Sequence, residues 1–440
     1  MKKVALIFLL FFVTISSKSQ TVDDPLIKEG NSLLAQKKYQ EAIAVFDKVV
    51  KKLPENADAY YGRGVAYSGI GNTMEAISDY TRANYFNPKK VEALINRGST
   101  FSGMQKYDDA LNDFNKAIEI APGRPDIYNN RGYLFSLQKK YDLAIKDYDK
   151  AIALNKSYSM AYINKAYAWN ALGSDSLAIG VLTKLISINP NYSSAYFNRA
   201  VMYRELNNNK LALADYESGL KLEPNDVTAL LKRAEIKDEM GDDKGAVDDC
   251  KKIIELEPAN SLAYYTKALA EYDLAQYDKI VEDCTNAIKY KPDYFEAYIL
   301  RGNAFDFLGN YQDALKDYNS AIEKHPNGSD AFNQRAIAET QKGNLVCALS
   351  DFTRAIKITP DNLDLLHKRA VLLFTTKNYD NALGDYNKIL SINADDVKAL
   401  VARGDIFVLQ DKMDYACADY KKAEKLGDGG AMSKRIFNCK

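Results

Sequence analysis

Four asparagines recur along the chain at one constant interval, and each directly precedes a basic residue. They are Asn96, Asn130, Asn164 and Asn198. A primary amide both donates and accepts hydrogen bonds, so a row of such side chains can hold the backbone of an extended peptide whatever its sequence. A solvated helix face explains the same residues equally well, and both interpretations stay open.

The stretch between residues 205 and 307 carries many carboxylates, with aromatic residues among them. The candidate binding residues there are Glu205, Glu235, Asp238, Glu239, Tyr265, Tyr272, Asp273, Asp306 and Phe307. Carboxylates attract cationic side chains and aromatic rings offer flat apolar contacts, so together they suit a basic or aromatic peptide. Charged residues that are simply exposed to solvent are the alternative explanation.

Residues for catalysis or metal binding do not form any recognisable motif. The two histidines, His325 and His367, lie far apart in the sequence, and no Cys/His set has zinc-site spacing. No glycine-rich phosphate loop or nucleophile motif occurs. Lys plus Arg and Asp plus Glu both number 59, so the basic surplus that sequence-independent nucleic-acid binding requires is missing. We therefore predict a non-enzymatic protein that binds no cofactor, metal or nucleic acid.

The elements that position these residues follow a strict period. Twelve equally spaced positions, from Ala42 and Ala76 to Ala416, are all alanine except Ile280. Glycine or alanine lies twelve positions before each of them, and proline lies twelve positions after nine of them. Apolar residues recur every three or four positions, which is typical of helices with one buried face, and the prolines end the second helix. Each period is therefore predicted to be two short antiparallel helices that cross at the small residues.

This pattern resembles the tetratricopeptide repeat, a 34-residue helix-turn-helix unit. The resemblance covers residues 23–430 as twelve tandem repeats. It implies an all-α, right-handed superhelical solenoid, in which the first helices line the concave face and carry the ligand-facing side chains. The asparagine row is similar to the asparagine ladder of O-linked N-acetylglucosamine transferases. Residues 431–440 are too few for another repeat, so we expect a C-terminal capping helix there.

Two columns of opposite charge run with the repeats. A basic residue recurs in eleven repeats from Arg63 to Arg403, and an aspartate recurs sixteen positions later in ten of them. In the repeat where Val181 replaces the aspartate, the basic residue is Lys165 instead of arginine, which favours pairing within a repeat. We predict Arg–Asp contacts within hydrogen-bonding distance in most repeats, with a structural role.

The N-terminus has the features of a secretory signal peptide. Lys2 and Lys3 precede an apolar run over residues 4–15, and small residues follow. A run of this length is too short to span a bilayer as a helix. We predict that residues 1–19 are removed on export; a buried N-terminal helix is the alternative.

The C-terminal region also indicates that the protein is exported from the cytoplasm. Cys417 and Cys439 can form a disulfide if the capping helix folds back, and an exported protein meets an oxidising environment. The segment ACADYKKAEKLGDGGA, residues 416–431, followed by a late cysteine, resembles the ending of exported repeat proteins in Bacteroidetes-like bacteria. That resemblance implies a Gram-negative envelope, with the protein in the periplasm or outside the cell.

The family resemblance implies a scaffold of the cell envelope that binds a protein or peptide segment along the concave face. Two alternatives remain: a structural envelope component that assembles through its outer faces or ends, and an accessory array that recruits substrates for a separate enzyme. Chaperone-binding relatives clamp a terminal carboxylate with Lys, Arg and Asn. At the matching positions this chain has mostly apolar residues and serine, so we reject that function.

The seventh and eighth repeats, residues 227–294, depart from the pattern. Cys250 and Cys284 replace large aromatic residues, whereas Lys237 and Glu271 stand where another aromatic residue is expected. We expect Lys237 and Glu271 to pair across the repeat boundary. Smaller side chains bury less apolar area, which lowers the local stability.

We therefore predict that the backbone amides of residues 227–294 exchange with solvent deuterium faster than those of the other repeats. Native-state hydrogen exchange followed by mass spectrometry measures this. Amides in this stretch that rank among the slowest in the chain would contradict the prediction.

Overall fold

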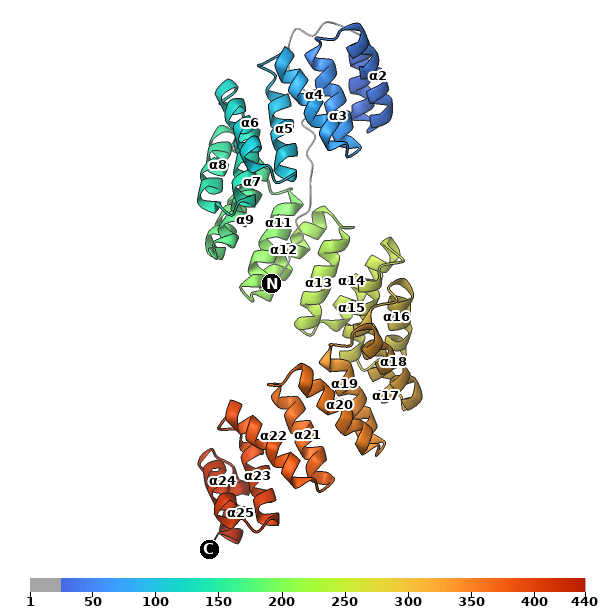
Figure 1. Cartoon of the computed structure of the whole chain (residues 1–440), viewed down its shortest axis with the longest axis vertical. Coiled ribbons are helices and arrows are strands. Elements are labelled where there is room, and N and C mark those ends of the chain that lie inside the picture. The colour runs from blue at the N-terminus through green and yellow to red at the C-terminus, as the bar shows by residue number, and fades with distance from the viewer. Residues whose placement is uncertain (1–24, 440) are drawn as a thin grey trace. The chain divides into compact units, whose positions relative to one another are not determined.

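The computed structural model describes residues 25–439, so the predicted signal segment 1–19 lies outside the described residues. This part of the chain consists of 25 helices joined by short turns, and no strand occurs in it (Figure 1). In the same range no helix has both the length and the apolar character that a membrane crossing requires. The predicted all-α array of helix pairs is confirmed.

The helices alternate between the first and second members of successive pairs. The first helices are α1 (Pro25–Ala35), α3 (Ala57–Gly69), α5 (Val91–Gly103), α7 (Pro125–Leu137), α9 (Ser159–Ala171), α11 (Ser193–Glu205), α13 (Val227–Glu239), α15 (Ser261–Asp273), α17 (Phe295–Phe307), α19 (Ser329–Gln341), α21 (Leu363–Thr375) and α23 (Val397–Leu409). The second helices are α2 (Tyr39–Lys52), α4 (Thr73–Phe86), α6 (Tyr107–Ile120), α8 (Tyr141–Leu154), α10 (Asp175–Ile188), α12 (Asn209–Leu222), α14 (Asp243–Leu256), α16 (Tyr277–Tyr290), α18 (Tyr311–Lys324), α20 (Leu345–Ile358), α22 (Tyr379–Ile392) and α24 (Met413–Lys425). A last helix, α25 (Gly429–Asn438), follows them. The described part of the chain forms two compact units, which divide between Asp215 and Tyr216 within α12.

One residue with left-handed backbone geometry ends the first helix of every pair. It recurs once per repeat, from Lys37 to Asp411, with φ between 53° and 82°. Five of the twelve are glycine, which adopts this geometry without strain, and the other seven include Ala275. The turn then closes with a backbone hydrogen bond such as that from Asn72 N to Tyr67 O, at 2.9 Å. This bond satisfies a carbonyl that the helix end leaves without a helical partner.

The small residue in each first helix receives a side chain from the second helix, most often an aromatic ring. A Cβ atom added to Gly132 would lie 2.7 Å from Cε1 of Tyr148, a residue that is 1% exposed. Gly404 and Tyr420 repeat this arrangement near the other end of the array. A larger residue at the glycine would separate the two helices or displace the ring. The predicted crossing point is confirmed.

The odd-numbered helices lie closer to one another than the even-numbered helices do. In the first compact unit, α1 contacts α3, and α5, α7, α9 and α11 contact their odd-numbered neighbours in turn; in the second, α13, α15, α17 and α19 do the same. No two even-numbered helices make contacts of that extent within residues 25–439. The odd-numbered helices therefore form the inner face within each unit.

The predicted Arg–Asp pairs are confirmed in nine repeats. In each, the arginine Nε and Nη2 bind the two oxygens of the aspartate sixteen positions later, as in Arg97 with Asp113 at 2.8 and 2.7 Å. The nine arginines are Arg63, Arg97, Arg131, Arg199, Arg233, Arg301, Arg335, Arg369 and Arg403. The planar guanidinium matches both carboxylate oxygens, which lysine cannot do.

Most of the same arginines also reach back to the preceding repeat, which the sequence did not indicate. Nη1 of Arg97 donates to Thr81 at 2.8 Å, and Nη1 of Arg131 donates to Asn115 at 2.8 Å; both acceptors lie sixteen positions earlier. Lys165, whose own repeat lacks the aspartate, binds backwards to Asp149 at 2.6 Å. Each of these basic residues thus joins the second helix of the preceding pair to its own pair.

The expected pair of Lys237 and Glu271 is wrong. Lys237 Nζ lies 2.9 Å from Asp249 Oδ2, and Glu271 lies instead beside Lys267, at 3.5 Å. Lys237 follows Arg233 by one helical turn, so both side chains reach the same aspartate.

The last helix is held by both polar and covalent contacts. A disulfide joins Cys417 on α24 to Cys439 just after α25, with the Cα atoms 5.7 Å apart. Arg435 Nε binds Glu424 at 2.6 Å, and the Asp428 side chain accepts from the Ala431 amide at the start of α25. Within the described part of the chain, Ala431 is the one buried residue of α25. Few apolar contacts hold this helix, so the disulfide carries much of its attachment.

Replacing Arg97 by alanine should destabilise the α5–α6 pair by about 3 kcal/mol, because Asp113 is only 1% exposed and would keep a buried, unpaired charge. The matched control is Lys165→Ala, whose partner Asp149 is 55% exposed, and its effect should stay below about 1 kcal/mol. Urea unfolding combined with hydrogen exchange of the affected helices gives both values. Equal effects of the two substitutions would disprove the structural role of the buried aspartate.

Cys417→Ser should release α25, because the disulfide closes a segment with a sequence separation of 22 and its loss removes about 3 kcal/mol of stabilisation. Amide protection in α25 and the last turns of α24 should fall, both in this variant and in the reduced wild type. Cys347→Ser, which changes an exposed free cysteine, serves as control and should leave the protection unchanged. Undiminished protection of α25 after reduction would contradict this account.

Candidate functional site

The asparagine row lies on the odd-numbered helices of the first compact unit. Asn96, Asn130, Asn164 and Asn198 come from α5, α7, α9 and α11, in that order, and all four are partly buried. Because odd-numbered helices form the inner face, the row follows that face. Peptide binding by the row remains a prediction.

Neighbouring helices already use part of the hydrogen-bonding capacity of these amides. Asn96 Nδ2 donates to the Tyr61 hydroxyl at 3.2 Å, and Asn164 Nδ2 donates to Asn129 Oδ1 at 2.9 Å. Both acceptors lie on the preceding odd-numbered helix. A primary amide has two N–H groups and one carbonyl, so one N–H of each amide is committed to the neighbouring helix. Asn96 also interacts with the Tyr80 hydroxyl of α4.

The amide of Asn198 is more fully engaged. Its Nδ2 donates to the Ser194 carbonyl at 2.6 Å, and its Oδ1 accepts from the Tyr167 hydroxyl. Asn130 Oδ1 accepts a long bond of 3.5 Å from Asn129. The four side chains therefore do not present equal hydrogen-bonding groups to a ligand.

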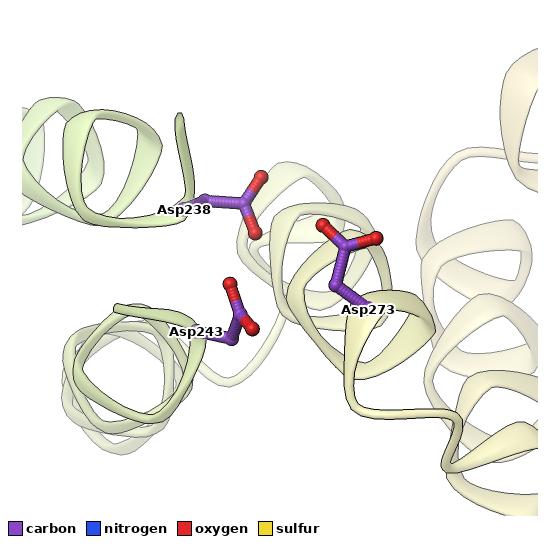
Figure 2. Close-up of side chains that lie close together, drawn as sticks. All are labelled: Asp238, Asp243 and Asp273. Carbon is purple, nitrogen blue, oxygen red and sulfur yellow. The ribbon is translucent and has the colours of Figure 1, made fainter. Parts of the chain in front are cut away.

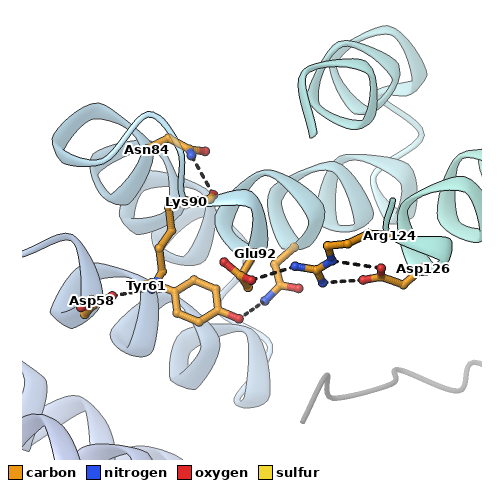
Figure 3. A network of polar contacts seen from close by, with 8 residues as sticks. Asp58, Tyr61, Asn84, Lys90, Glu92, Arg124 and Asp126 are labelled. Carbon is orange, nitrogen blue, oxygen red and sulfur yellow. Dashed lines mark hydrogen bonds and ion pairs between the residues drawn. The ribbon is translucent and has the colours of Figure 1, made fainter. Parts of the chain in front are cut away.

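A polar network that the sequence reasoning missed adjoins this row. Arg124 Nη1 binds Glu92 at 2.8 Å while its Nε and Nη2 bind Asp126, and Lys90 binds Asp58 in the equivalent way one repeat earlier (Figure 3). The base follows its acidic partner by slightly less than one repeat in both pairs, so each pair joins the starts of two successive odd-numbered helices. That recurring acid–base offset is the sequence signal that could have revealed the network. These pairs stiffen the inner face rather than leaving its charges free.

Burial makes Tyr61, the tyrosine next to this network, a weaker acid than usual. Tyr61 has its pKa raised to about 12, mainly by burial and further by the nearby Glu92 carboxylate. Tyr61 therefore stays a neutral hydroxyl at every physiological pH and accepts the Asn96 bond in that form.

The second compact unit brings three carboxylates together. Asp238 at the end of α13, Asp243 at the start of α14 and Asp273 at the end of α15 point toward one another, with one oxygen of each within 4.8 Å of the others (Figure 2). One oxygen each of Asp238 and Asp243 is buried and accepts no hydrogen bond. Burial, then Asp273 and Asp243, raises the pKa of Asp238 to about 6. We refer to these three residues as the acidic cluster.

The position of the acidic cluster increases its preference for a cation. Asp238 and Asp273 lie at helix C-termini, where the partial negative charge of the helix end disfavours a carboxylate. Three carboxylate oxygens are only half of the six ligands that calcium or magnesium requires, so we assign no metal here. The ammonium of lysine and the guanidinium of arginine, with three and five N–H donors, match the unpaired oxygens better.

An exposed aromatic group lies next to the acidic cluster along the chain. Phe307, 59% exposed, stacks on Tyr277 with the ring centres 4.6 Å apart, and Tyr272 meets both rings edge-on. Tyr272 directly precedes Asp273 at the end of α15, which joins the aromatic group to the acidic cluster. We refer to Tyr272, Tyr277 and Phe307 as the aromatic group.

The two groups occupy equivalent positions in three successive repeats. Three sets of residues are each spaced by one repeat length: Asp238, Tyr272 and Asp306; Glu239, Asp273 and Phe307; and Asp243, Tyr277 and Tyr311. The surface thus changes from acidic in the seventh repeat to largely aromatic in the ninth. All nine positions lie at or beside the turns between odd- and even-numbered helices, at the edge of the inner face rather than in its middle.

The other residues predicted for this surface are placed differently. Glu235 binds Lys232 one turn earlier on α13, at 2.9 Å, and the Tyr265 ring packs against Tyr294 at 4.9 Å. Glu205 accepts a hydrogen bond from Asn170 and belongs to the first compact unit. Asp243 and Tyr277, which begin α14 and α16, were not predicted.

Comparison with known proteins identifies the repeat throughout much of the chain. Models described as "Tetratricopeptide repeat" match residues 57–90, 91–124, 125–158, 181–214, 228–260 and 295–327, and one described as "TPR repeat" matches residues 30–71. Together these matches cover about half of the chain. Among curated proteins, a "Protein SGT1 homolog" from Dictyostelium discoideum is 40% identical over 53 residues. That match spans 12% of this chain and 14% of the relative.

Solved structures with similar helix arrays include yeast Tom70, at 17% identity and a TM-score of 0.44, covering 94% of this chain and 93% of that one. A tetratricopeptide repeat protein from Parabacteroides merdae shares 23% identity with a TM-score of 0.44, covering 56% of this chain and 97% of its own. YrrB, described as a TPR protein with an unusual peptide-binding site, shares 20% identity with a TM-score of 0.33, covering 42% of this chain and 95% of its own. The helix pairs, their period and the family matches show that the chain belongs to the tetratricopeptide repeat family, whose arrays are scaffolds for protein–protein interaction.

Proposed function

We propose that this protein is an exported scaffold that binds a basic segment of a partner protein at the acidic cluster and the aromatic group. The observation that carries the proposal is that three clustered carboxylates, two with unpaired oxygens, adjoin along the chain a group of stacked rings in which Phe307 is exposed. A lysine or arginine of the partner would bind the carboxylates, and an apolar or aromatic neighbour would pack on Phe307.

Charge complementarity supports a cationic partner over an acidic or neutral one. The acidic cluster concentrates negative charge at two helix C-termini, and burial together with the neighbouring carboxylates raises the pKa of Asp238. A cation would relieve the repulsion among the three carboxylates and lower this pKa. Binding energy and electrostatic relief therefore favour the same ligand.

Asparagines on the inner face would bind a further part of the partner. Hydrogen-bonding groups of Asn96 and Asn164 that neighbouring helices do not use would bind the backbone of an extended segment without selecting its sequence. The predicted signal segment 1–19 and the disulfide between Cys417 and Cys439 support a location outside the cytoplasm. We propose the periplasm or the extracellular side of a Gram-negative envelope.

The test uses short synthetic peptides in matched pairs, each with an Arg-aromatic centre or with glutamate in place of the arginine. Calorimetry with the purified array should detect the basic member of each pair and not the acidic one. Asp238→Asn with Asp273→Asn should weaken binding of the basic peptides by about tenfold or more, because their charge loses its counter-ions. Phe307→Ala should weaken it by several-fold.

The control is Asp108→Asn with Asp142→Asn, which removes two exposed carboxylates from the first turns of α6 and α8. Its affinity for the basic peptides should equal that of the wild type. Equal losses in the two double variants would mean that net charge alone attracts the peptides. Unchanged affinity in the Asp238/Asp273 variant would refute the proposed site.

Affinity should also fall as the pH decreases from 7 to 5. Asp238 has a raised pKa of about 6, so acidification neutralises it within this range. The Asp238→Asn variant should lack this part of the pH dependence. Calorimetric titrations at several pH values, with the same basic peptide, measure the difference.

A further inference from the structure

At one position near the end of the first helix, the repeats carry residues of different chemistry. Most repeats have a large apolar residue there, and most of these side chains pack against the core. They are Leu33, Tyr67, Phe101, Phe135, Trp169, Tyr203, Phe305, Leu373 and Phe407. Three repeats have a charged residue at the same position: Lys237, Glu271 and Glu339.

Two of the three charged residues are well provided with partners. Lys237 Nζ lies 2.9 Å from Asp249. Glu339 accepts hydrogen bonds from the Tyr311 hydroxyl and from Asn344 Nδ2, both at 2.6 Å on the same oxygen. These two donors satisfy one oxygen of Glu339, a residue that is only 9% exposed.

Glu271 has no comparable set of donors. It is 1% exposed, its Oε2 accepts no hydrogen bond, and its Oε1 lies 3.5 Å from Lys267 Nζ. The same ammonium binds Asp283 Oδ2 at 2.8 Å, and Asp283 is 3% exposed. One cation thus serves two buried carboxyl groups, which leaves an excess negative charge if both are ionised.

In repeat eight, lysine replaces the arginine, so the aspartate can accept a hydrogen bond from a further donor. In nine repeats the guanidinium binds both oxygens of the aspartate, whereas Lys267 binds Oδ2 of Asp283. A protonated Glu271 has an O–H group that can donate to the Asp283 carboxylate, which interacts with it. The surplus charge and the missing donor are then both removed.

We propose that Glu271 is protonated at neutral pH and donates its O–H to Asp283, and that loss of this proton loosens the packing of α15 on α16. Repeat eight, which contains this helix pair, is then a pH-sensitive element of the array.

The electrostatic surroundings agree with this assignment. Burial, and then Asp283, raise the pKa of Glu271 to about 8, while Lys267 opposes the shift. Charged and titratable groups on the helices around this pair include Asp238 on α13, Lys237 and Arg233 of the same helix bound to Asp249 on α14, Cys250 on α14, Cys284 on α16, Arg301 on α17 and Asp317 on α18. Burial raises the pKa of both cysteines far above neutrality, so neither titrates in the relevant range.

The sign of the effect follows from linkage. The folded-state pKa of Glu271 lies above its unfolded value, so the folded state binds this proton more tightly. The stabilisation is fully present below the unfolded pKa and is lost as the pH rises toward about 8. Asp238, with a pKa of about 6, has largely completed its own titration by pH 7, so the range from pH 7 to 8.5 isolates Glu271.

The same proton bears on the proposed binding surface, and this consequence rests on the proposed function. Glu271 directly precedes Tyr272 and Asp273, and Ala275 closes the helix with a left-handed φ of 53° that a non-glycine residue adopts at a cost. Loosening of α15 would therefore displace part of the acidic cluster and of the aromatic group. The loosening itself does not depend on any partner.

Hydrogen exchange of the full array, corrected for the intrinsic pH dependence of amide exchange, tests the inference. In the wild type, the opening of α15 and α16 should become more favourable by about eightfold between pH 7 and 8.5, because the open state releases the proton that the closed state holds. Glu271→Gln keeps the size and a donor but cannot ionise, so its opening should not change over this range. Glu271→Phe restores the residue type of the other repeats and serves as a second variant without a titrating group.

Glu339→Gln is the matched control, because it changes the equivalent residue two repeats later. It should leave the pH dependence of α15 and α16 as in the wild type. An identical pH dependence in the wild type and in both Glu271 variants would overturn the proposal. Peptide affinity is measured separately, so a failure of the proposed binding site leaves the exchange result intact.

Discussion

The double engagement of one arginine determines how each helix pair sits on the preceding one. The guanidinium binds a buried aspartate sixteen positions ahead and an acceptor sixteen positions behind. A buried ion pair adds little net stability over an apolar contact, but an aspartate without its partner costs about 3–5 kcal/mol. The aspartate therefore fixes the arginine within its own pair, and any displacement of that pair along its neighbour would break the backward hydrogen bond from Nη1. The contact therefore selects one register among the many that apolar faces alone would permit.

Much of the fold was predictable because the period leaves few choices. The spacing of Gly132, Ala144 and Tyr148 specifies two helices, their crossing point and the ring that fills it. The backward acceptors were not predicted, because Thr81 and Asn115 look like ordinary surface residues until the guanidinium reaches them. The seven non-glycine residues with left-handed geometry were not predicted either. There the hydrogen bonds of the turn outweigh a local preference of about 1–2 kcal/mol per residue.

The candidate site was predictable only in part, since it combines residues from adjoining helices. Asp238 and Asp273 were selected for their charge, whereas Asp243 was missed because it begins the next helix and reaches them only in space. Tyr277 was missed for the same reason, although Phe307 stacks on it. Lys237 was assigned the wrong partner because its ammonium shares Asp249 with Arg233, one helical turn earlier. Sequence position gives the register of a side chain but not the rotamer that decides between two neighbouring acceptors.

The backward contact of the arginine has a consequence for how such a chain can be rearranged. Its acceptor is a threonine, an asparagine or an aspartate in different repeats, and every one of them offers an oxygen at the same point. A segment of one repeat length excised from one place would therefore find compatible neighbours at most others, and duplication or loss of whole segments would preserve these joints. Lys165 marks an exception, because it needs the negative charge of Asp149 behind it. Exchange of segments is thus free along most of the array and restricted at Lys165, which binds only to the repeat behind it.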